Sequence, residues 1–374
     1  MVIQQLRVSG FRNYERVELS PPPGITVLYG ANAQGKTNLI EAVSLCCLGR
    51  SHRTPRDAEL VRWGESMAQV RIRVQRRDGP HEVGVTLSRD EGRKKAIRIN
   101  GTAIERMGEL MGHVNAVLFS PEDLRLVKDG PEVRRRFLDM EISQLRPAYF
   151  YALQRYARAL HQRNGLLHTL REEPGHALGA TLDDWDALLL EAGAQVIQRR
   201  IAYLQALEAE SARIHGALSE GREALALRYA GQAEDAQTLE RLLHAARGED
   251  LRRGTTTVGP HRDDFRLLIN GRDARLFASQ GQQRTAALSL KLAETEVMRR
   301  MLDEPPVLLL DDVMSELDIK RRRMLLERLG GVQTLITCTD LSDLGGAKHD
   351  AAVRVENGAL REETSEKESG HDTV

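Results

Sequence analysis

Apolar and polar residues alternate in several short stretches near both ends of the chain. Val70, Ile72 and Val74 show the pattern, each separated from the next by one polar residue. A period of two places alternate side chains on one face of a β-strand. Similar spacing of apolar residues predicts further strands at 3–8, 17–19, 83–87, 97–99 and 265–269. Asn100-Gly101 and Asn270-Gly271 follow two of these strands and are typical of tight hairpin turns.

Other apolar runs are uninterrupted, as expected of strands buried on both faces. They lie at 25–28, 117–119, 307–310 and 334–336. Apolar residues recur at helical spacing between residues 39 and 48, where Gly49 is a fitting stop, and between 319 and 329. Another helix is predicted from about 280 to 301, and a final hairpin at 353–358. This combination of elements predicts an α/β fold with a mixed sheet and a separate antiparallel β subdomain.

The middle of the chain has a different character. Between about 133 and 251 the strand patterns disappear, and Leu, Ala, Arg, Glu and Gln dominate. The run 182–218 alone predicts a helix of about 55 Å at 1.5 Å per residue. We therefore expect one α/β domain from 1–124 and 252–360, an all-helical arm inserted at 125–251, and a disordered polar tail at 361–374.

Composition narrows the class of protein without naming its chemistry. The 374 residues are 41% hydrophobic and 29% charged, with zero formal net charge, as in soluble globular proteins. No apolar run reaches the roughly 18 residues of a membrane span, and the N-terminal segment lacks signal-peptide features. Three cysteines without metal-ligand spacing favour a reducing cytoplasm. An excess of basic residues between Arg50 and Arg98 is a candidate face for a polyanion, or ordinary solvated strand surface.

A glycine-rich loop joins the strand at 25–28 to the helix that follows it. The residues Gly30-Ala31-Asn32-Ala33-Gln34-Gly35-Lys36-Thr37, with Asn38 after them, match G-x-x-x-x-G-K-[ST]. In this pattern the loop and the helix N-terminus direct backbone N–H groups at a triphosphate. Lys36 is then expected to contact the β- and γ-phosphates, and Thr37 to hold Mg²⁺. The sequence thus predicts an ATP site.

Two acidic residues end the apolar run at 307–310. The Asp311 carboxylate is placed to hold Mg²⁺, and Asp312 to act as the general base that polarises the attacking water. Lys36, Asp311 and Asp312 are therefore the candidate catalytic residues. Without the glycine-rich loop, the two acids would indicate only a strand end followed by a solvated turn.

A short polar segment begins the helix before that strand. Ser279, Gly281, Gln282 and Gln283 belong to Ser279-Gln280-Gly281-Gln282-Gln283. By pattern alone this segment is an ordinary helix N-cap. Because it precedes the acidic strand end with one helix between, it is also a candidate lid over the γ-phosphate of ATP bound to a second copy of the chain. Arg134-Arg135-Arg136 near the root of the arm are candidate DNA contacts, or else a solvated helix face.

Together these motifs resemble the ABC-type ATPase heads of the SMC family and, more narrowly, the RecF family of bacterial recombination mediators. The resemblance runs from the N-terminus to about Gly358. It is carried by Phe11-Arg12-Asn13-Tyr14, the glycine-rich loop, Gly49-Arg50-Ser51-His52-Arg53, Phe119 to Leu124, Gly259 to Asp264, and Ser279 to Gln283. It implies an ATPase head with an inserted arm, which binds ATP and Mg²⁺ and forms an ATP-dependent homodimer.

The resemblance also implies roles for individual residues. Ser315 and Asp318 would lie in the dimer-contacting loop, and Arg12, with Arg50 or Arg53, would contact nucleotide phosphates. Two departures from common ABC ATPases imply slow, switch-like hydrolysis. Asp312 replaces the usual glutamate, and Thr339 stands where transporter ATPases have a switch histidine.

The implied function is ATP-dependent DNA binding in recombinational repair and replication. The dimer would bind double-stranded DNA beside a single-stranded gap and, with RecR and RecO, promote RecA loading and SOS induction. Two alternatives remain open on the sequence: the ATPase subunit of a membrane transporter, and a short-armed SMC-like structural protein. The long segment between Thr37 and Ser279 and the absent histidine count against the first.

Overall fold

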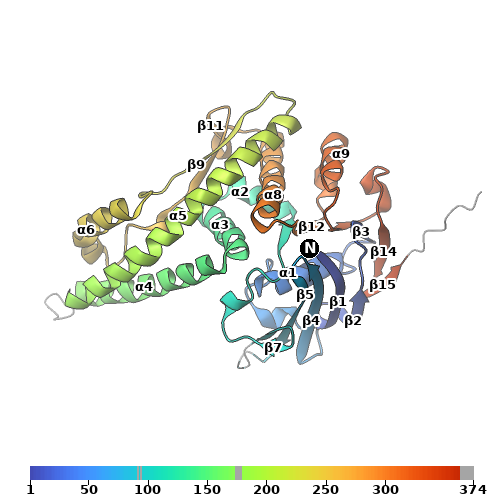
Figure 1. The fold of residues 1–374 in the computed structure, drawn as a ribbon, viewed down its shortest axis with the longest axis horizontal. Helices are drawn as coiled ribbons and strands as arrows, with labels where there is room; N and C mark the ends of the chain where they lie inside the picture. The colour runs from blue at the N-terminus through green and yellow to red at the C-terminus, as the bar shows by residue number, and fades with distance from the viewer. Residues whose placement is uncertain (91, 93–94, 173–178, 363–374) are drawn as a thin grey trace, which may run out of the picture. The chain divides into compact units, whose positions relative to one another are not determined.

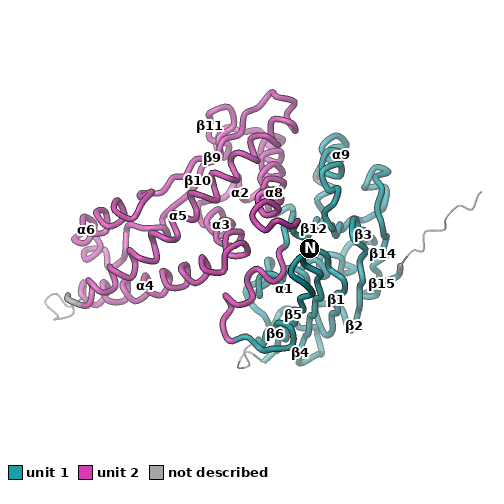
Figure 2. Tube along the Cα trace, in the orientation of Figure 1, with its two compact units in different colours: residues 1–104, 116–121, 306–374 teal, residues 105–115, 122–305 magenta. Residues whose placement is uncertain are grey.

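The computed structural model describes residues 1–90, 92, 95–172 and 179–362, which fall into two compact units (Figure 1; Figure 2). Unit 1 comprises residues 1–104, 116–121 and 306–374, and unit 2 comprises residues 105–115 and 122–305. The predicted disordered tail falls outside the described residues from 363 onwards. No helix of the described residues is both long and apolar enough to cross a bilayer.

Unit 1 contains a six-stranded antiparallel sheet with one buried face. Its strands, in spatial order, are β2 (Tyr14–Leu19), β1 (Val2–Phe11), β4 (Met67–Arg76), β5 (Gly79–Ser88), β6 (Ala96–Ile99) and β7 (Thr102–Ala103). Along β4, Val70, Ile72 and Val74 are buried while the residues between them are exposed. The strands predicted from alternating residues in this part of the chain are thus confirmed.

The second sheet of unit 1 is mostly parallel and carries the buried apolar runs. Its order is β15 (Ala359–Glu362), β14 (Ala351–Glu356), β3 (Ile25–Tyr29), β13 (Thr334–Cys338), β12 (Val307–Asp311) and β8 (Ala116–Phe119). Every neighbouring pair is parallel except the β14–β15 hairpin. All five residues of β12 and of β13 are buried, which explains why these strands lack alternation.

Two helices follow central strands of this sheet. Helix α1 (Lys36–Leu48) follows β3, and Gly49 ends it in the left-handed conformation. Helix α9 (Ile319–Arg328) lies between β12 and β13 in the chain. Because β3, β12 and β13 are parallel, their carboxyl ends share one edge of the sheet, where α/β proteins bind ligands. The three cysteines, two in α1 and one in β13, are buried and free.

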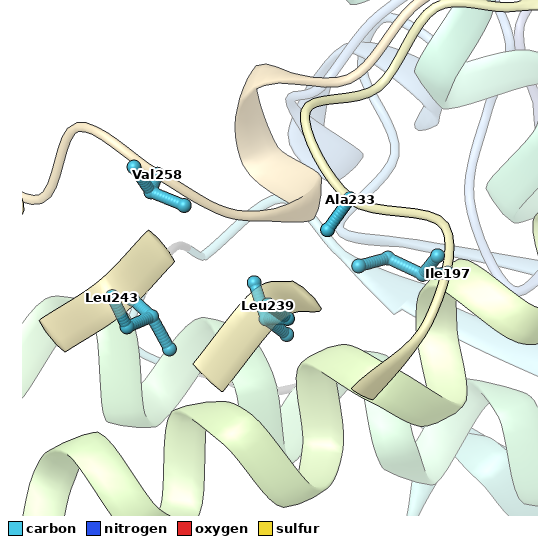
Figure 3. Close-up of a cluster of buried hydrophobic side chains, with 5 residues drawn as sticks. All are labelled: Ile197, Ala233, Leu239, Leu243 and Val258. Atoms are coloured by element: carbon cyan, nitrogen blue, oxygen red, sulfur yellow. The ribbon is translucent and has the colours of Figure 1, made fainter. Parts of the chain in front are cut away.

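Unit 2 consists of helices and a small sheet. The longer helices are α3 (Pro131–Leu145), α4 (Pro147–Glu172), α5 (Gly179–Leu218), α6 (Ala236–Arg253) and α8 (Gln280–Leu302), and the short ones are α2 (Arg125–Lys128) and α7 (Ala274–Phe277). Helix α5 has 40 residues and is therefore about 60 Å long. Figure 3 shows Leu239 of α6 near Ile197 of α5, in a buried apolar cluster that also contains Leu243 of α6, Ala233 and Val258.

Two predictions about this region were wrong in part. The arm is not entirely helical, because β9 (Leu225–Tyr229) pairs with β10 (Phe265–Ile269), which also pairs with β11 (Arg272–Asp273). Leu225 and Leu227 are buried and Ala226 and Arg228 are less so, an alternation too short to stand out between helices. Pairing to β9 and packing of α8 on α5 also place residues 252–305 in unit 2, although they were assigned to the α/β domain.

A charged cluster lies inside unit 2. Glu141 of α3 and Glu294 of α8 are both buried, and Lys291 Nζ lies 2.5 Å from Glu294 Oε2. Burial, and next the charge of Glu294, raise the pKa of the Glu141 carboxyl well above its usual range, against the opposing effect of Lys291. The charge of Asp123 acts in the same direction as that of Glu294. Glu141 is therefore expected to retain its proton to a higher pH in the folded protein than in the unfolded chain.

Glu141→Gln is expected to be more stable than the wild type at pH 8 and to lose this advantage near pH 5. A raised carboxyl pKa means that the folded state binds a proton that the unfolded state releases, so wild-type stability falls as pH rises above about 4.5. The loss is about 1.4 kcal/mol for each pH unit over which the proton is retained. Urea unfolding from pH 5 to 8 measures it. Glu132→Gln, at an exposed position of the same helix, should show no such dependence.

Candidate nucleotide site

The glycine-rich loop spans the gap between β3 and α1. Gly30 and Gly35 have φ values of 144° and 116°, and Gly35 is the N-cap of α1. A Cβ at Gly35 would lie 2.6 Å from Asn13 Nδ2 and 2.9 Å from the Tyr14 hydroxyl. Both the backbone conformation and the lack of space therefore require glycine at this position. The loop is followed by a helix N-terminus, as the sequence predicted.

Two hairpin turns of unit 1 brace the loop from outside. Asn13 Nδ2 donates to the Gln34 carbonyl oxygen at 2.8 Å, and the Tyr14 hydroxyl donates to the Gly35 carbonyl oxygen at 2.9 Å. From the β14–β15 turn, the Asn357 N–H donates to Gln34 Oε1 at 2.7 Å. The sequence motif containing Asn13 and Tyr14 was recognised, but its bracing function was not. These carbonyl contacts leave the backbone N–H groups of the loop free of competition from the two side chains.

The ammonium group of Lys36 is hydrogen-bonded to carbonyl oxygens of the glycine-rich loop itself. Its Nζ donates to Gly30 O at 2.5 Å and to Ala31 O at 2.8 Å. Burial lowers the pKa of Lys36, while Asp312, Cys338 and Asp311 act in the opposite direction. The lysine is thus held at the mouth of the loop, close to Asp311 at the end of β12 and to Asp312 directly after it.

Thr37 and Asp311 meet although they are far apart in the chain. Thr37 Oγ1 donates to Asp311 Oδ1 at 2.8 Å, and Thr337 Oγ1 donates to the same oxygen at 2.8 Å. Burial raises the pKa of Asp311, and the two hydroxyl donors oppose that effect. Hydroxyl and carboxylate oxygens are the ligands that Mg²⁺ prefers. The donor set therefore fits a magnesium ion held by Thr37 and Asp311. Thr337 was missed because the predicted strand ended one residue before it, at 336.

Asp312 directly follows the buried strand but is exposed. It adopts a left-handed backbone with φ of 53°, and its N–H donates to Thr337 Oγ1 at 2.9 Å. Ser315 Oγ donates to the Asp312 carbonyl oxygen at 2.9 Å. Asp318 caps α9 by accepting from the Arg321 N–H at 2.8 Å. The predicted dimer loop therefore lies on the surface immediately after the acidic pair.

The candidate phosphate-contacting arginines have different environments. Arg12 Nε and Nη2 donate to the two carboxylate oxygens of Glu41 at 2.8 and 2.7 Å. Arg53 Nη1 donates to Asn38 Oδ1 at 2.9 Å. Arg50 is exposed. Glu41 was missed by the sequence reading, although an acid within the apolar stretch of α1 was an available signal.

In unit 2, the segment at 279–283 forms the first turn of α8. Ser279 Oγ accepts from the Gln282 N–H at 3.3 Å and Gln282 Oε1 accepts from the Ser279 N–H at 2.8 Å, so the two residues cap the helix reciprocally. Gln283 is buried and donates to the Ala274 carbonyl oxygen. Ser279 and Gly281 are exposed, and no atom lies within 4 Å of a Cβ built at Gly281. Capping is thus present, and the outer surface of the turn is open to a ligand.

The short helix that precedes this turn carries exposed apolar residues. Leu276 and Phe277, which end α7, have exposed fractions of 71% and 68%. Neighbouring large apolar side chains at such exposure are typical of a surface that contacts another protein.

The arginine cluster at the root of the arm requires a correction. Arg134 is buried and bonds Asp264 through Nε and Nη2 at 2.7 and 2.8 Å, so the structure contradicts its assignment as a DNA contact. A bidentate pair of this kind holds the guanidinium inside the protein. Arg135 is half-buried and donates to the Asp263 carbonyl oxygen. Arg136 is exposed.

Comparison with known proteins agrees with this geometry. The chain matches the RecF/RecN/SMC N-terminal domain family over residues 2–359. It is 46% identical over 355 residues to a protein of Symbiobacterium thermophilum named DNA replication and repair protein RecF, covering 92% of this chain and 93% of the relative. It is 43% identical over 343 residues to the protein of that name from Lachnoclostridium phytofermentans, covering 92% and 94%. The chain belongs to the RecF family.

Solved structures support the same placement. A structure described as the recombination mediator protein RecF-ATP in the RecFOR pathway has a TM-score of 0.90 and 36% identity to this RecF-family chain, covering 97% of it and 98% of the solved chain. An Smc head domain from Pyrococcus furiosus has a TM-score of 0.57 at 17% identity, which shows a shared fold. The predicted family and the predicted ATPase-head fold class are both confirmed.

Proposed function

We propose that this protein is an ATP-dependent DNA-binding protein of recombinational repair and replication. The hydrogen bond between Thr37 and Asp311, which joins the glycine-rich loop to the end of β12, carries the proposal. It brings the two motifs of a P-loop ATPase into one site at the carboxyl edge of the parallel strands. RecF-family relatives named for DNA replication and repair supply the biological setting.

Each residue of the loop has a defined task in binding ATP. Lys36 exchanges the Gly30 and Ala31 carbonyl oxygens for the β- and γ-phosphates, which are stronger acceptors for an ammonium group. Backbone N–H groups from Gly30 to Thr37, with Asn38 beside them, surround the phosphates. Thr37 and Asp311 hold Mg²⁺, which neutralises negative charge on the phosphates.

Hydrolysis is proposed to be slow. Asp312 orients the attacking water and accepts its proton, but its side chain is one methylene shorter than the usual glutamate. Thr339 Oγ1 donates to Asp343 Oδ2 at 2.9 Å, so this position has a neutral hydroxyl instead of an imidazole. A protein with such a site acts as a switch, since the ATP-bound state persists until the γ-phosphate is lost.

Two copies are proposed to close around ATP. Ser279 and Gly281 of one copy lie over the γ-phosphate held by the other, where the helix N-terminus favours negative charge. Gln282 and Gln283 fix the turn that presents them. The exposed loop with Ser315 and Asp318 contacts the partner copy beside the site. Each composite site then depends on both copies.

DNA is proposed to bind through its phosphates to basic surfaces of the dimer. In the antiparallel sheet, Arg7 lies opposite Arg71, and Arg71 and Arg98 both lie opposite Gly84. These arginines project from the exposed face of their strands. Arg136, with Arg135, is a further candidate. Because such contacts release counterions, binding should weaken steeply with salt.

The partners that we propose are taken from the pathway named for a related protein. A related solved structure is described as belonging to the RecFOR pathway. We propose that the dimer binds double-stranded DNA next to a single-stranded gap in the cytoplasm and, with RecR and RecO, promotes RecA loading and SOS induction. The family assignment disfavours the transporter alternative, and a 40-residue arm helix is short for a structural SMC-like arm.

Gel filtration with light scattering on a gapped duplex tests the proposal. With ATP and Mg²⁺, the wild type is expected to elute as a dimer that retains DNA, and without ATP as a monomer that retains little. Lys36→Arg should fail to pair, because the wider guanidinium does not fit the position of the lysine ammonium. The proposal would be contradicted if the protein formed dimers equally well without ATP and also retained no DNA.

A further inference from the structure

One carboxylate in helix α1 organises the basic side chains around the glycine-rich loop. Glu41 is fully buried, and Arg12, Arg53 and Ser51 all donate hydrogen bonds to its two oxygens. Ser51 Oγ lies 2.5 Å from Glu41 Oε1 and also accepts from the N–H groups of Arg53 and Thr54. Glu41 thereby ties the turn that follows α1 back onto the helix.

Arg12 is fully engaged in this cluster. Two of its nitrogens bond both oxygens of Glu41, and Nη1 donates to the Glu59 carbonyl oxygen at 3.1 Å. The side chain of Arg12 is 19% exposed. A bidentate, charge-assisted pair in this environment is among the strongest side-chain contacts in proteins. Moving Arg12 to a ligand would leave the buried Glu41 charge uncompensated, which is costly.

Arg53 is held differently. Its Nη1 contacts Asn38 Oδ1 at 2.9 Å and, at a longer 3.3 Å, Glu41 Oε2. Its Nε and Nη2 have no hydrogen-bond partner among the described residues, and the side chain is 43% exposed. Arg53 is therefore held at the start of α1 with donors to spare.

The charges in the cluster do not balance. One buried carboxylate serves two guanidinium groups, and the shorter, bidentate contacts go to Arg12. The uncompensated positive charge therefore resides on Arg53, the more exposed of the two. A fixed cation beside the first turn of a helix that follows a phosphate-binding loop is suited to an anionic ligand.

We propose that Glu41 is a positioning residue that immobilises Arg12 as a structural partner and presents Arg53 to the phosphates of the nucleotide. This inference rests on the proposed ATP site. Holding Arg53 in place before ATP binds reduces the side-chain entropy that binding would otherwise cost. Arg12, which was expected to contact the nucleotide, is instead assigned to the scaffold.

A double-mutant cycle on ATP affinity tests the inference. Glu41→Gln and Arg53→Met are each expected to weaken ATP binding about tenfold, the value of one charge-assisted contact. The double variant Glu41→Gln/Arg53→Met is expected to bind ATP no more weakly than Arg53→Met alone, because Glu41 acts through Arg53. Affinity for ATP is measured by fluorescence titration, and thermal melting without nucleotide checks that each variant is folded.

Glu59→Gln is the matched control. It makes the same change in an exposed acid whose carboxylate contacts neither Arg12 nor Arg53, and it should leave ATP affinity unchanged. If Glu41→Gln does not fold, Glu41→Asp replaces it in the double-mutant cycle. The shorter aspartate keeps a negative charge beside Arg12, but its carboxylate no longer reaches Arg53.

Three outcomes would overturn the inference. The first is that Glu41→Gln binds ATP as tightly as the wild type or more tightly, as expected if Glu41 only repels the phosphates. The second is that Glu41→Gln has as large an effect in the Arg53→Met background as alone, as expected of a merely structural residue. Absence of ATP binding by the wild type would overturn the proposed function itself, and the inference with it.

Discussion

Replacing Ser279 with arginine is expected to prevent ATP-dependent pairing while leaving the ATP affinity of each copy nearly unchanged. Ser279 is exposed in unit 2, whereas the loop and Asp311 that hold ATP belong to unit 1. If Ser279 covers the triphosphate of a second copy, a long side chain there separates the two surfaces. Such a clash costs several kcal/mol and should weaken pairing by roughly a hundredfold or more.

Light scattering with ATP and Mg²⁺ measures pairing, and titration at a concentration below pairing measures affinity. Asp235→Arg is the control, because Asp235 is the N-cap of α6 in the same unit and its replacement also removes a cap, worth about 1 kcal/mol. That variant should still pair. If Ser279→Arg lost ATP affinity as an isolated monomer, the idea of a composite site would fail.

Asp312→Asn is expected to slow ATP hydrolysis by roughly 10²–10⁴-fold and to lengthen the lifetime of the ATP-bound dimer. The amide does not accept the proton of the attacking water, so general-base assistance is lost. Asparagine suits the left-handed backbone at φ 53°, and the Asp312 N–H bond to Thr337 does not involve the side chain. The loop geometry should therefore survive the substitution.

Steady-state phosphate release and the rate of dimer dissociation measure the two effects. Asp303→Asn makes the same replacement at another left-handed aspartate, with φ of 55°, at the end of α8, and should hydrolyse ATP normally. Unchanged phosphate release by Asp312→Asn would show that another group polarises the water.

Local sequence patterns predicted the structural elements correctly where a single physical cause determines which residues are used. The alternation along β4 reflects a sheet with one buried face, and the continuous apolar run of β12 reflects a strand covered on both faces. The left-handed Gly49 at the end of α1 was predictable because few other residues adopt that conformation at little cost. Strand β9 was missed because five residues with weak alternation, between two helices, give little local signal.

The arginines mark the limit of sequence reasoning in the site. Arg12 and Arg134 looked like surface cations available to anions. Each meets a carboxylate far away in the chain, Glu41 for Arg12 and Asp264 for Arg134. Arg136, two residues after Arg134, is exposed. Nothing in the charge pattern separates these cases, because the partner of a long basic side chain is decided by packing.

The amino-acid sequence by itself determined the ATPase-head class, the loop at 30–37, the acids at 311 and 312, and the presence of a helical arm. These features are local, because short-range stereochemistry and phosphate chemistry dictate residue types at fixed spacing. Only the tertiary structure decided that Thr37 meets Asp311, that 252–305 pack with the arm, and that Glu41 forms a bidentate pair with Arg12. Such contacts join distant segments, and they depend on how buried surfaces and charges are matched when the chain folds.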